Sequence, residues 1–378
     1  MKTITIKNFG PIKDVTIELK KLTLLIGPQA GGKSVIAKLV SMFSDPEVYF
    51  EKEFVPFLQS NNIDYPLSKE SVFEYQSGNY KATVKGTQFN HNHPYKRMNG
   101  GLKTVIRDVL KDQFKIDHPD PEKLLFELFR KRDFKKRINW TEKECIYIPA
   151  ERNLFVLLTE KIFSLSHLQR TLFLPSDLIK FGYHYETARD AFSKGVAANI
   201  SFIKSLNYSR EKNKDFIEYK EVKTPLSQGS SGFKSAIPLA LVCLNSSKEG
   251  NSQFIIEEPE QNLYPETQYE LIKFLTETSL SKDNRLLVTT HSPYILTAFS
   301  NLMQAHNTAK KDEVSTMKIV RKKHWIDFKN VSAYYIDKGT CRNILDRESR
   351  LIDANAIDKA SDAINKEFDK LLEIENRK

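Results

Sequence analysis

One segment of this chain has the residue types and spacing that phosphate binding requires. Residues 27–34, GPQAGGKS, satisfy the pattern GxxxxGK[ST]. In this pattern backbone N–H groups form a nest for a β-phosphate, Lys33 reaches the β- and γ-oxygens, and Ser34 offers its hydroxyl to Mg²⁺. The predicted nucleotide-binding residues of this loop are Gly27, Pro28, Gln29, Ala30, Gly31, Gly32, Lys33 and Ser34.

Two adjacent carboxylates follow an apolar run in FIIEEPEQNLYP. The run predicts a buried strand, so Glu257 and Glu258 are expected at its carboxyl end, where ligands bind in open α/β sheets. Glu257 would hold Mg²⁺ and Glu258 would orient and deprotonate an attacking water, because phosphoryl transfer depends mostly on positioning and charge neutralisation. The alternative is two solvent-exposed glutamates without a chemical role.

Three further positions have both a chemical and a structural interpretation. His291 ends the strand predicted for LLVTT and could hydrogen-bond a γ-phosphate, although an isolated histidine is usually structural. Residues 230–232 precede a helical run and could present hydroxyls and helix N-terminal amides to an anion, or form a plain N-cap. Arg152, beside Glu151 after another strand, could contact phosphate, hold Glu258, or form an ordinary surface ion pair.

The elements around these residues predict an α/β protein. Residues 3–9 and 15–19 alternate as strands around a Gly-Pro turn, and 22–26 form a buried strand before the glycine loop. Residues 35–43 have helical spacing, which completes the strand, loop and helix order that phosphate binding needs. From 254 to 342 strands and helices alternate again.

The chain is expected to divide into four regions. Residues 1–44 and 229–378 form the two parts of a mixed-sheet core, 45–143 an insertion lobe, and 144–228 a strand with a helical arm. Within the lobe we expect a hairpin around 77–79 and a basic amphipathic helix at 122–138. Residues 153–206 are expected to be mostly helical, and 356–374 to form a closing amphipathic helix.

Composition narrows the class of protein. The 378 residues are 40% hydrophobic and 28% charged, with a net charge of +10. No apolar stretch reaches the roughly 18 to 20 residues that span a bilayer, and no secretory signal is visible, so we expect a cytoplasmic protein. The three cysteines, Cys145, Cys243 and Cys341, have the wide spacing of reduced structural thiols. Basic runs at 131–137 and 321–323 are either phosphate-contacting patches or exposed surface.

Together these motifs resemble the ABC-type ATPase heads of the SMC, RecF and OLD families. GPQAGGKS is similar to their Walker A motif, FIIEE to Walker B with the catalytic glutamate, PEQNL to the D-loop, VTTHSP to the H-loop and GSSGFKSAIPLAL to the signature motif. More narrowly, IKNFGPI, YIPAER, SSG, IEEPE and the late VSAYYIDKGTCRNILD resemble the small OLD-like and Septu PtuA-like ATPases of bacterial anti-phage systems.

The resemblance implies a P-loop fold, ATP and Mg²⁺ as cofactors, and catalytic roles for Lys33, Glu258 and His291. It also implies that Ser230, Ser231 and Gly232 contact ATP bound by a second subunit, in a head-to-tail homodimer or a higher oligomer. The chain departs from the pattern at Phe233, where the signature usually carries Gln or Glu. It also departs at Asn262, often His in the D-loop, and at Gly10, often basic. No Q-loop glutamine can be assigned.

The function expected first is a regulatory ATPase of an anti-phage system that controls a separate effector such as a nuclease. A separate effector is expected because residues 292–378 are too few for the nuclease domain of OLD proteins. The alternative is a RecF-like, DNA-binding repair clamp, suggested by the length and the basic surface. The ATPase subunit of a membrane transporter is a third possibility, and the N-terminal strand pair is unlike that class.

Overall fold

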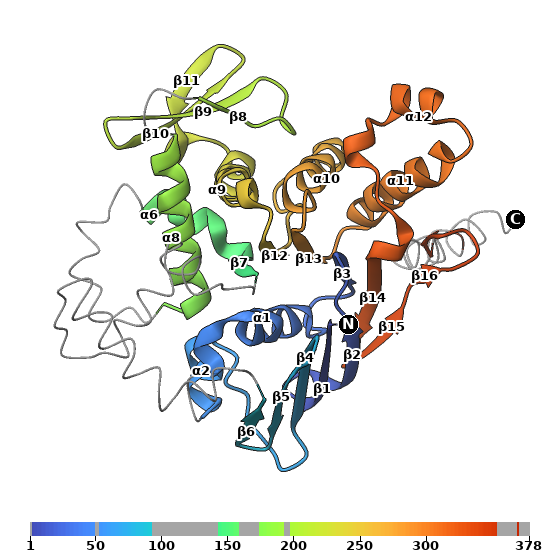
Figure 1. Cartoon of the computed structure of the whole chain (residues 1–378). Coiled ribbons are helices and arrows are strands. Elements are labelled where there is room, and N and C mark those ends of the chain that lie inside the picture. Colours follow the sequence, from blue (N-terminus) through green and yellow to red (C-terminus); the bar gives the residue numbers. More distant parts are fainter. Residues whose placement is uncertain are drawn as a thin grey trace, which may run out of the picture.

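An eleven-stranded mixed sheet forms the centre of the molecule (Figure 1). The computed structural model describes residues 2–49, 53–92, 143–158, 174–192, 197–353 and 369. The strand order is β6-β5-β4-β1-β2-β15-β14-β3-β13-β12-β7. The strands are β1 (Lys2–Phe9), β2 (Ile12–Glu18), β3 (Leu22–Ile26), β4 (Val72–Ser77), β5 (Tyr80–Lys85), β6 (Gln88–His91), β7 (Glu144–Ile148), β12 (Ser252–Glu257), β13 (Arg285–Thr290), β14 (Val331–Asp337) and β15 (Thr340–Asn343).

The sheet has a parallel half and an antiparallel half. Strands β14, β3, β13, β12 and β7 pair in parallel, whereas β2, β1, β4, β5 and β6 pair antiparallel to one another. The hairpin expected around 77–79 is confirmed as β4 and β5. Gly10, in the turn between β1 and β2, has φ +53, and a Cβ there would lie 2.5 Å from the Tyr65 ring. The turn therefore favours glycine at this position.

Both faces of the parallel half are buried. Along β3 the side chain of Leu24 enters one hydrophobic core and that of Leu25 the other, as period-two alternation requires. Helix α1 (Lys33–Ser44) covers one face, and α9 (Ser231–Ser246), α10 (Pro265–Ser279) and α11 (Pro293–Ala309) cover the other (Figure 1). The apolar runs without polar alternation are explained by this double burial.

The remaining elements surround this core. The other helices are α2 (Val55–Ser60), α6 (Leu154–Leu158), α8 (Ser176–Ala191) and α12 (Glu313–Ile319), and the 3-10 turns are η1 (Pro46–Tyr49), η2 (Ala150–Asn153), η3 (Leu226–Gln228), η4 (Ser247–Glu249), η5 (Lys322–His324) and η6 (Phe328–Asn330). A four-stranded sheet comprises β8 (Ala198–Asn199), β9 (Leu206–Glu211), β10 (Lys214–Tyr219) and β11 (Val222–Pro225), and β16 (Leu345–Asp346) pairs with β17 (Leu351–Ile352).

Several expectations change at this level. The four-stranded sheet lies in the region 144–228, for which the sequence predicted one strand and a helical arm, so the prediction there missed these strands. The helices expected at 122–138 and 356–374 lie outside the described residues, and the division into four regions stays a prediction. The three cysteines are free thiols, as predicted. The turn at 321–323 is exposed, and Lys322 and Lys323 pair with Glu313 and Glu277 at 2.7 Å.

Candidate nucleotide-binding site

The glycine loop joins β3 to α1 in the order that the sequence predicted. A Cβ on Gly27 would lie 1.9 Å from the carbonyl oxygen of Ile336 in β14, so no side chain fits there. Gly32 has φ +100 immediately before α1, and a Cβ there would meet Ile12 at 2.9 Å. Two of the loop glycines are therefore required by close packing against the neighbouring backbone and side chains.

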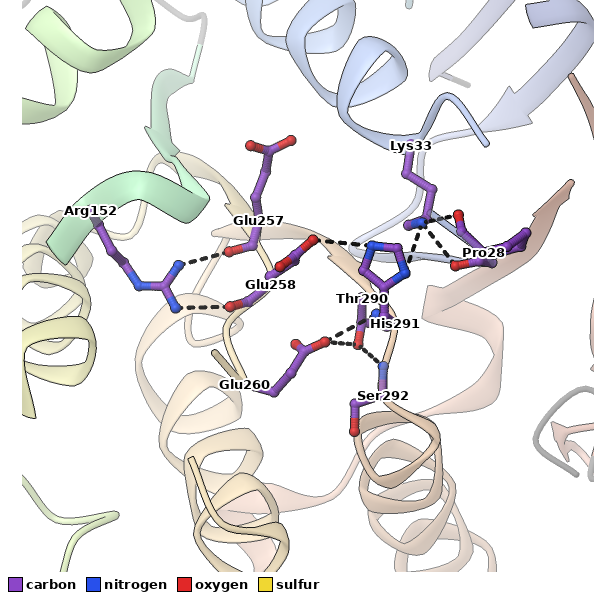
Figure 2. A network of polar contacts seen from close by, with 10 residues as sticks. Pro28, Lys33, Arg152, Glu257, Glu258, Glu260, Thr290, His291 and Ser292 are labelled. Carbon is purple, nitrogen blue, oxygen red and sulfur yellow. Dashed lines mark hydrogen bonds and ion pairs between the residues drawn. The ribbon is translucent and has the colours of Figure 1, made fainter. Parts of the chain in front are cut away.

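Lys33 lies inside the loop rather than in solvent. Its Nζ donates to the carbonyl oxygens of Gly27 and Pro28, both at 2.8 Å, and lies 3.4 Å from Nδ1 of His291 (Figure 2). Burial lowers the pKa of Lys33 to about 8, and the nearby charges of Glu258, Glu260 and Glu257 partly oppose this shift. The two loop carbonyls thus hold the ammonium group within reach of His291.

Glu257 is the last residue of β12 and is buried, with only 4% of its surface exposed. Burial raises the pKa of this carboxyl, whereas the nearby hydroxyls of Ser34 and Tyr147 favour the charged form. Among the described residues its Oε1 has no hydrogen-bond partner. An unpaired buried carboxylate oxygen beside a serine hydroxyl fits the oxygen ligands that Mg²⁺ prefers.

Glu258 and His291 face each other across two neighbouring strand ends. Oε1 of Glu258 lies 3.1 Å from Nε2 of His291, and both side chains are about one-third exposed. Glu258 has φ +42, a strained conformation for this residue type, and its N–H donates to Thr289 O at 2.9 Å. Lys33, His291 and Glu258 thus form one continuous polar chain (Figure 2).

A second set of contacts fixes the backbone around His291. Oε1 of Glu260 accepts from the Thr290 hydroxyl at 2.6 Å and from the His291 N–H at 3.0 Å. The Thr290 hydroxyl in turn accepts from the Ser292 N–H at 2.9 Å (Figure 2). Sequence reasoning did not identify Glu260 or Thr290 as site residues. Their only signal was proximity to Glu258 and His291 within the two motifs.

Arg152 contradicts one of the expectations. It is completely buried, so the interpretation as a surface ion pair is wrong. Its guanidinium donates to backbone carbonyls only, including those of Glu257 and Glu258 at 2.8 Å each (Figure 2). Since these contacts occupy its donors, phosphate contact is also excluded. Burial lowers its pKa to about 10, opposed by the charges of Glu260, Glu258 and Glu257. The remaining alternative, that Arg152 holds Glu258, agrees with these contacts.

The signature segment, residues 229–241, begins helix α9. Ser230 is the N-cap residue, and its hydroxyl accepts from the Phe233 N–H at 3.3 Å. Ser230 and Ser231 are exposed. Within the described part of the chain, no hydrogen bond or ion pair joins Ser230, Ser231 or Gly232 to Lys33, Glu258 or His291. The structure therefore brings together the loop, the carboxylates and His291, and leaves the start of α9 facing solvent.

Comparison with known proteins identifies the family. A family model described as the AAA ATPase domain matches residues 1–166 and 158–296. The chain belongs to the AAA ATPase domain family. The matched residues of this ATPase domain contain the loop, both carboxylates, His291 and the signature segment. No curated protein matches the chain. None of the described helices is long and apolar enough to cross a membrane, and no cluster of three or more His, Cys, Asp or Glu side chains among the described residues could hold a metal ion.

Solved structures with similar folds include SMC heads and ATP-binding cassettes. An SMC head domain from Thermotoga maritima is 12% identical, with a TM-score of 0.41, covering 90% of this chain and 97% of that chain. An SMC head bound to the C-terminal winged-helix domain of ScpA is 11% identical, with a TM-score of 0.45 and coverage of 90% and 96%. A dimeric ATP-binding cassette bound to ADP and Pi is 11% identical, with a TM-score of 0.34 and coverage of 91% and 97%. The predicted fold class of this ATPase domain, α/β with a P-loop and a mixed sheet, is confirmed.

Two departures from the signature and D-loop patterns have local explanations in this ATPase domain. The ring of Phe233 packs on Tyr219 of β10, with ring centroids 5.2 Å apart, so the small sheet supports the start of α9. Asn262 has φ +60 in the loop after Glu258. Asparagine tolerates this left-handed conformation better than most residues because its short amide can hydrogen-bond locally.

Proposed function

We propose that the chain binds ATP with Mg²⁺ in the loop 27–34 and hydrolyses it to ADP and phosphate. The observation that carries this proposal is the chain of contacts from Lys33 through His291 to Glu258, beside the carboxyl ends of β3, β12 and β13. These side chains converge where a γ-phosphate held by the loop would lie. Backbone N–H groups of residues 27–34 and the Lys33 ammonium would hold the phosphates.

Ser34 and Glu257 would hold Mg²⁺ in this proposal. The support is chemical: a hydroxyl and a carboxylate are hard oxygen ligands, and Oε1 of Glu257 is buried without a hydrogen-bond partner among the described residues. When bound, Mg²⁺ would neutralise charge on the phosphate oxygens. Tyr147, whose hydroxyl lies beside Glu257, would orient the carboxylate.

Glu258 would act as the general base. Its carboxylate takes a proton from water while the water oxygen bonds to the γ-phosphorus and the bond to the ADP oxygen breaks. His291 Nε2, now 3.1 Å from Glu258, would hydrogen-bond the γ-phosphate once nucleotide is present. The contacts of Glu260 with Thr290 and the His291 N–H would keep the imidazole aimed at that position.

We propose further that two copies form a head-to-tail homodimer, with ATP held between the loop of one subunit and the signature segment of the other. The exposure of Ser230 and Ser231 at the N-terminus of α9 supports this arrangement, because a free helix N-terminus and two hydroxyls can receive a γ-phosphate from outside. ATP would close the dimer and hydrolysis would open it.

The output of this switch would be control of a separate effector protein, such as a nuclease, in anti-phage defence. This step rests on the resemblance of residues 6–12, 147–152 and 256–260 to the OLD-like and PtuA-like ATPases. Purification of the tagged chain expressed from its own operon tests it. A stoichiometric second protein would support the proposal, and recovery of the chain alone would count against it.

Steady-state ATP hydrolysis with three variants tests the site. Glu258→Gln should retain ATP binding, lose turnover by about 10²- to 10⁴-fold and accumulate as the ATP-bound dimer. Lys33→Ala should lose nucleotide binding. Glu266→Gln, an exposed carboxylate in the first turn of α10, is the matched control and should hydrolyse ATP like the parent. Turnover by both site variants at the parent rate would show that the site is assigned wrongly.

The RecF-like clamp remains the second candidate because the net charge is +10. It predicts that duplex DNA stimulates hydrolysis and that ATP strengthens salt-sensitive DNA binding. DNA-indifferent turnover would favour the switch. Strong stimulation by DNA would favour the clamp.

A further inference from the structure

Arg152 is an unusual buried arginine because backbone carbonyls satisfy its whole guanidinium. The side chain is 0% exposed and takes part in none of the ion pairs among the described residues. A guanidinium has five N–H donors and no acceptor. Five carbonyl oxygens surround it: Ser235 at 3.1 Å from Nε, Pro149 at 3.1 Å and Glu257 at 2.8 Å from Nη1, and Glu258 at 2.8 Å and Pro259 at 3.4 Å from Nη2.

Four of these five carbonyls belong to two elements that carry different parts of the site, and the fifth, that of Pro149, lies in the segment of Arg152 itself. Ser235 lies in α9, the helix that begins at the exposed Ser230 cap. Glu257 to Pro259 form the end of β12 and the start of the following loop. The guanidinium is planar and its donors have a fixed geometry. A displacement of α9 therefore has to move Arg152, and with it the backbone that carries Glu258, or break a hydrogen bond of a buried charge.

A second contact joins the same two elements. A Cβ on Gly232 would lie 2.8 Å from the carbonyl oxygen of Asn262, so the backbone of the signature segment touches the loop that follows Glu258. Glu258 itself has φ +42, a conformation that persists only where surrounding contacts hold it. Its carbonyl is held by Arg152 and its N–H by Thr289.

We infer that Arg152 is a positioning residue that couples the start of α9 to Glu258. The inference rests on the proposed function, in which Ser230 of one subunit contacts the ATP bound by the other. In that dimer, ATP that contacts Ser230 across the interface displaces α9. Arg152 transmits this displacement to the backbone of Glu258 in the same subunit. The position of Glu258 in each subunit therefore depends on the nucleotide bound at the loop 27–34 of the other subunit. Hydrolysis at the two sites is cooperative as a result.

Arg152→Lys tests this coupling while keeping the positive charge. Lysine has three donors on a single atom and cannot reach all five carbonyls. We expect ATP affinity within about twofold of the parent, because the loop 27–34 is unchanged. Turnover per folded molecule should fall by about 10- to 100-fold, as for other residues that orient catalytic groups. The Hill coefficient for ATP should fall from above one to one.

Arg189→Lys is the matched control. Arg189 is also buried, at 5% exposure, but it pairs with Asp215 of β10 at 2.8 Å and contacts no residue of the site. This variant makes the same arginine-to-lysine change in a buried guanidinium, whose Nε and Nη2 contact the Asp215 carboxylate at 3.1 and 2.8 Å. Its turnover per folded molecule and its Hill coefficient should match the parent. ATP-binding stoichiometry gives the folded fraction for both variants.

If Arg152→Lys does not fold, Gly232→Ala probes the second contact without altering a buried charge. The added methyl group pushes the signature segment away from Asn262, so ATP binding at the subunit's own loop 27–34 should persist while turnover and cooperativity fall.

Four results would overturn the inference: a parent Hill coefficient of one, parent-like turnover in Arg152→Lys, the same losses in Arg189→Lys, or, where Arg152→Lys does not fold, parent-like kinetics in Gly232→Ala. If Glu258→Gln is inactive while Arg152→Lys is normal, only the coupling fails. If Glu258→Gln hydrolyses ATP like the parent, the proposed function fails first.

Discussion

Asp177 gives a quantitative prediction of how stability depends on pH, because the structure buries this carboxyl without a full set of hydrogen-bond partners. It lies in the first turn of α8, with 4% of its surface exposed and Oδ2 without a hydrogen-bond partner among the described residues. The ammonium of Lys38 in α1 lies 3.9 Å away. Burial raises the pKa of Asp177 to about 7, and the charges of Lys38 and Lys180 only partly oppose the shift.

The sign of the effect on stability follows from proton uptake. Between pH 4 and 7 the folded protein keeps Asp177 protonated while the unfolded chain ionises it, so the native state binds more protons. The free energy of unfolding therefore falls as pH rises through this window. The pKa rises from 3.8 to about 7, roughly three units at 1.36 kcal/mol each, so the whole effect is on the order of 4 kcal/mol. About 3 kcal/mol of it falls between pH 5 and 8.

Asp177→Asn replaces the carboxyl by a neutral group of the same shape. Urea unfolding of parent and variant at pH 5 and pH 8 gives the stability difference between the two proteins at each pH. The change in this difference between pH 5 and pH 8 measures the effect of Asp177, because the contributions of all other titrating groups cancel. The variant should be more stable than the parent by about 1 to 2 kcal/mol at pH 5 and by about 4 kcal/mol at pH 8, so that the stability difference grows by about 3 kcal/mol between the two pH values.

Asp312→Asn serves as the control for this measurement. Asp312 caps α12, and its hydrogen bonds to Ser315 hold its pKa below the usual value of 3.8. It is ionised in the folded and unfolded chain throughout pH 5 to 8, so this substitution should shift both stabilities equally. An equal shift at both pH values for Asp177→Asn as well would refute the reasoning, because it would mean that Asp177 is already ionised at pH 5.

Three further substitutions test the site. Gly27→Ala should abolish ATP binding, because the new Cβ would lie 1.9 Å from Ile336 O. Titration with a fluorescent nucleotide measures this, and Gly78→Ala, whose Cβ would have nothing within 4 Å, should bind ATP normally. Thr290→Val should cost about 1 to 3 kcal/mol in chemical unfolding, since Glu260 loses a donor and the Ser292 N–H an acceptor. Its turnover should fall more than its ATP affinity, and equal losses would contradict the role given to His291. Tyr147→Phe removes the hydroxyl beside Glu257, and should raise the Mg²⁺ concentration for half-maximal hydrolysis by up to about tenfold without lowering the thermal midpoint.

The sequence predicted those parts of the site that depend on local patterns. The strand Leu22–Ile26, the loop 27–32 and the helix after it form in that order because each has its own signal: an apolar run, glycines and helical spacing. The positions of Glu257 and His291 at strand ends follow from the apolar runs before them. Two adjacent parallel strands then bring these ends together, since β13 lies between β3 and β12.

Arg152 shows why other parts could not be predicted. An arginine after a strand is usually exposed, and here a full shell of carbonyls permits its burial. Those carbonyls come from backbone groups at 149, 235 and 257–259, and a backbone carbonyl has no residue type that a sequence could reveal. Glu260 was missed for a related reason, because its partners are the Thr290 hydroxyl and the backbone N–H of His291.

The small sheet that the sequence did not predict explains the departure at Phe233. The strands β9 and β10 are short and rich in charged residues, so their sequence has little of the apolar alternation that predicts a strand. Yet Ile217 of β10 lies 3.0 Å from the Cβ position of Gly229, and Tyr219 packs on Phe233. A polar glutamine at 233 would face this aromatic ring. The phenylalanine is therefore explained by the sheet, and a glycine at 229 leaves room for Ile217 at the start of the signature segment.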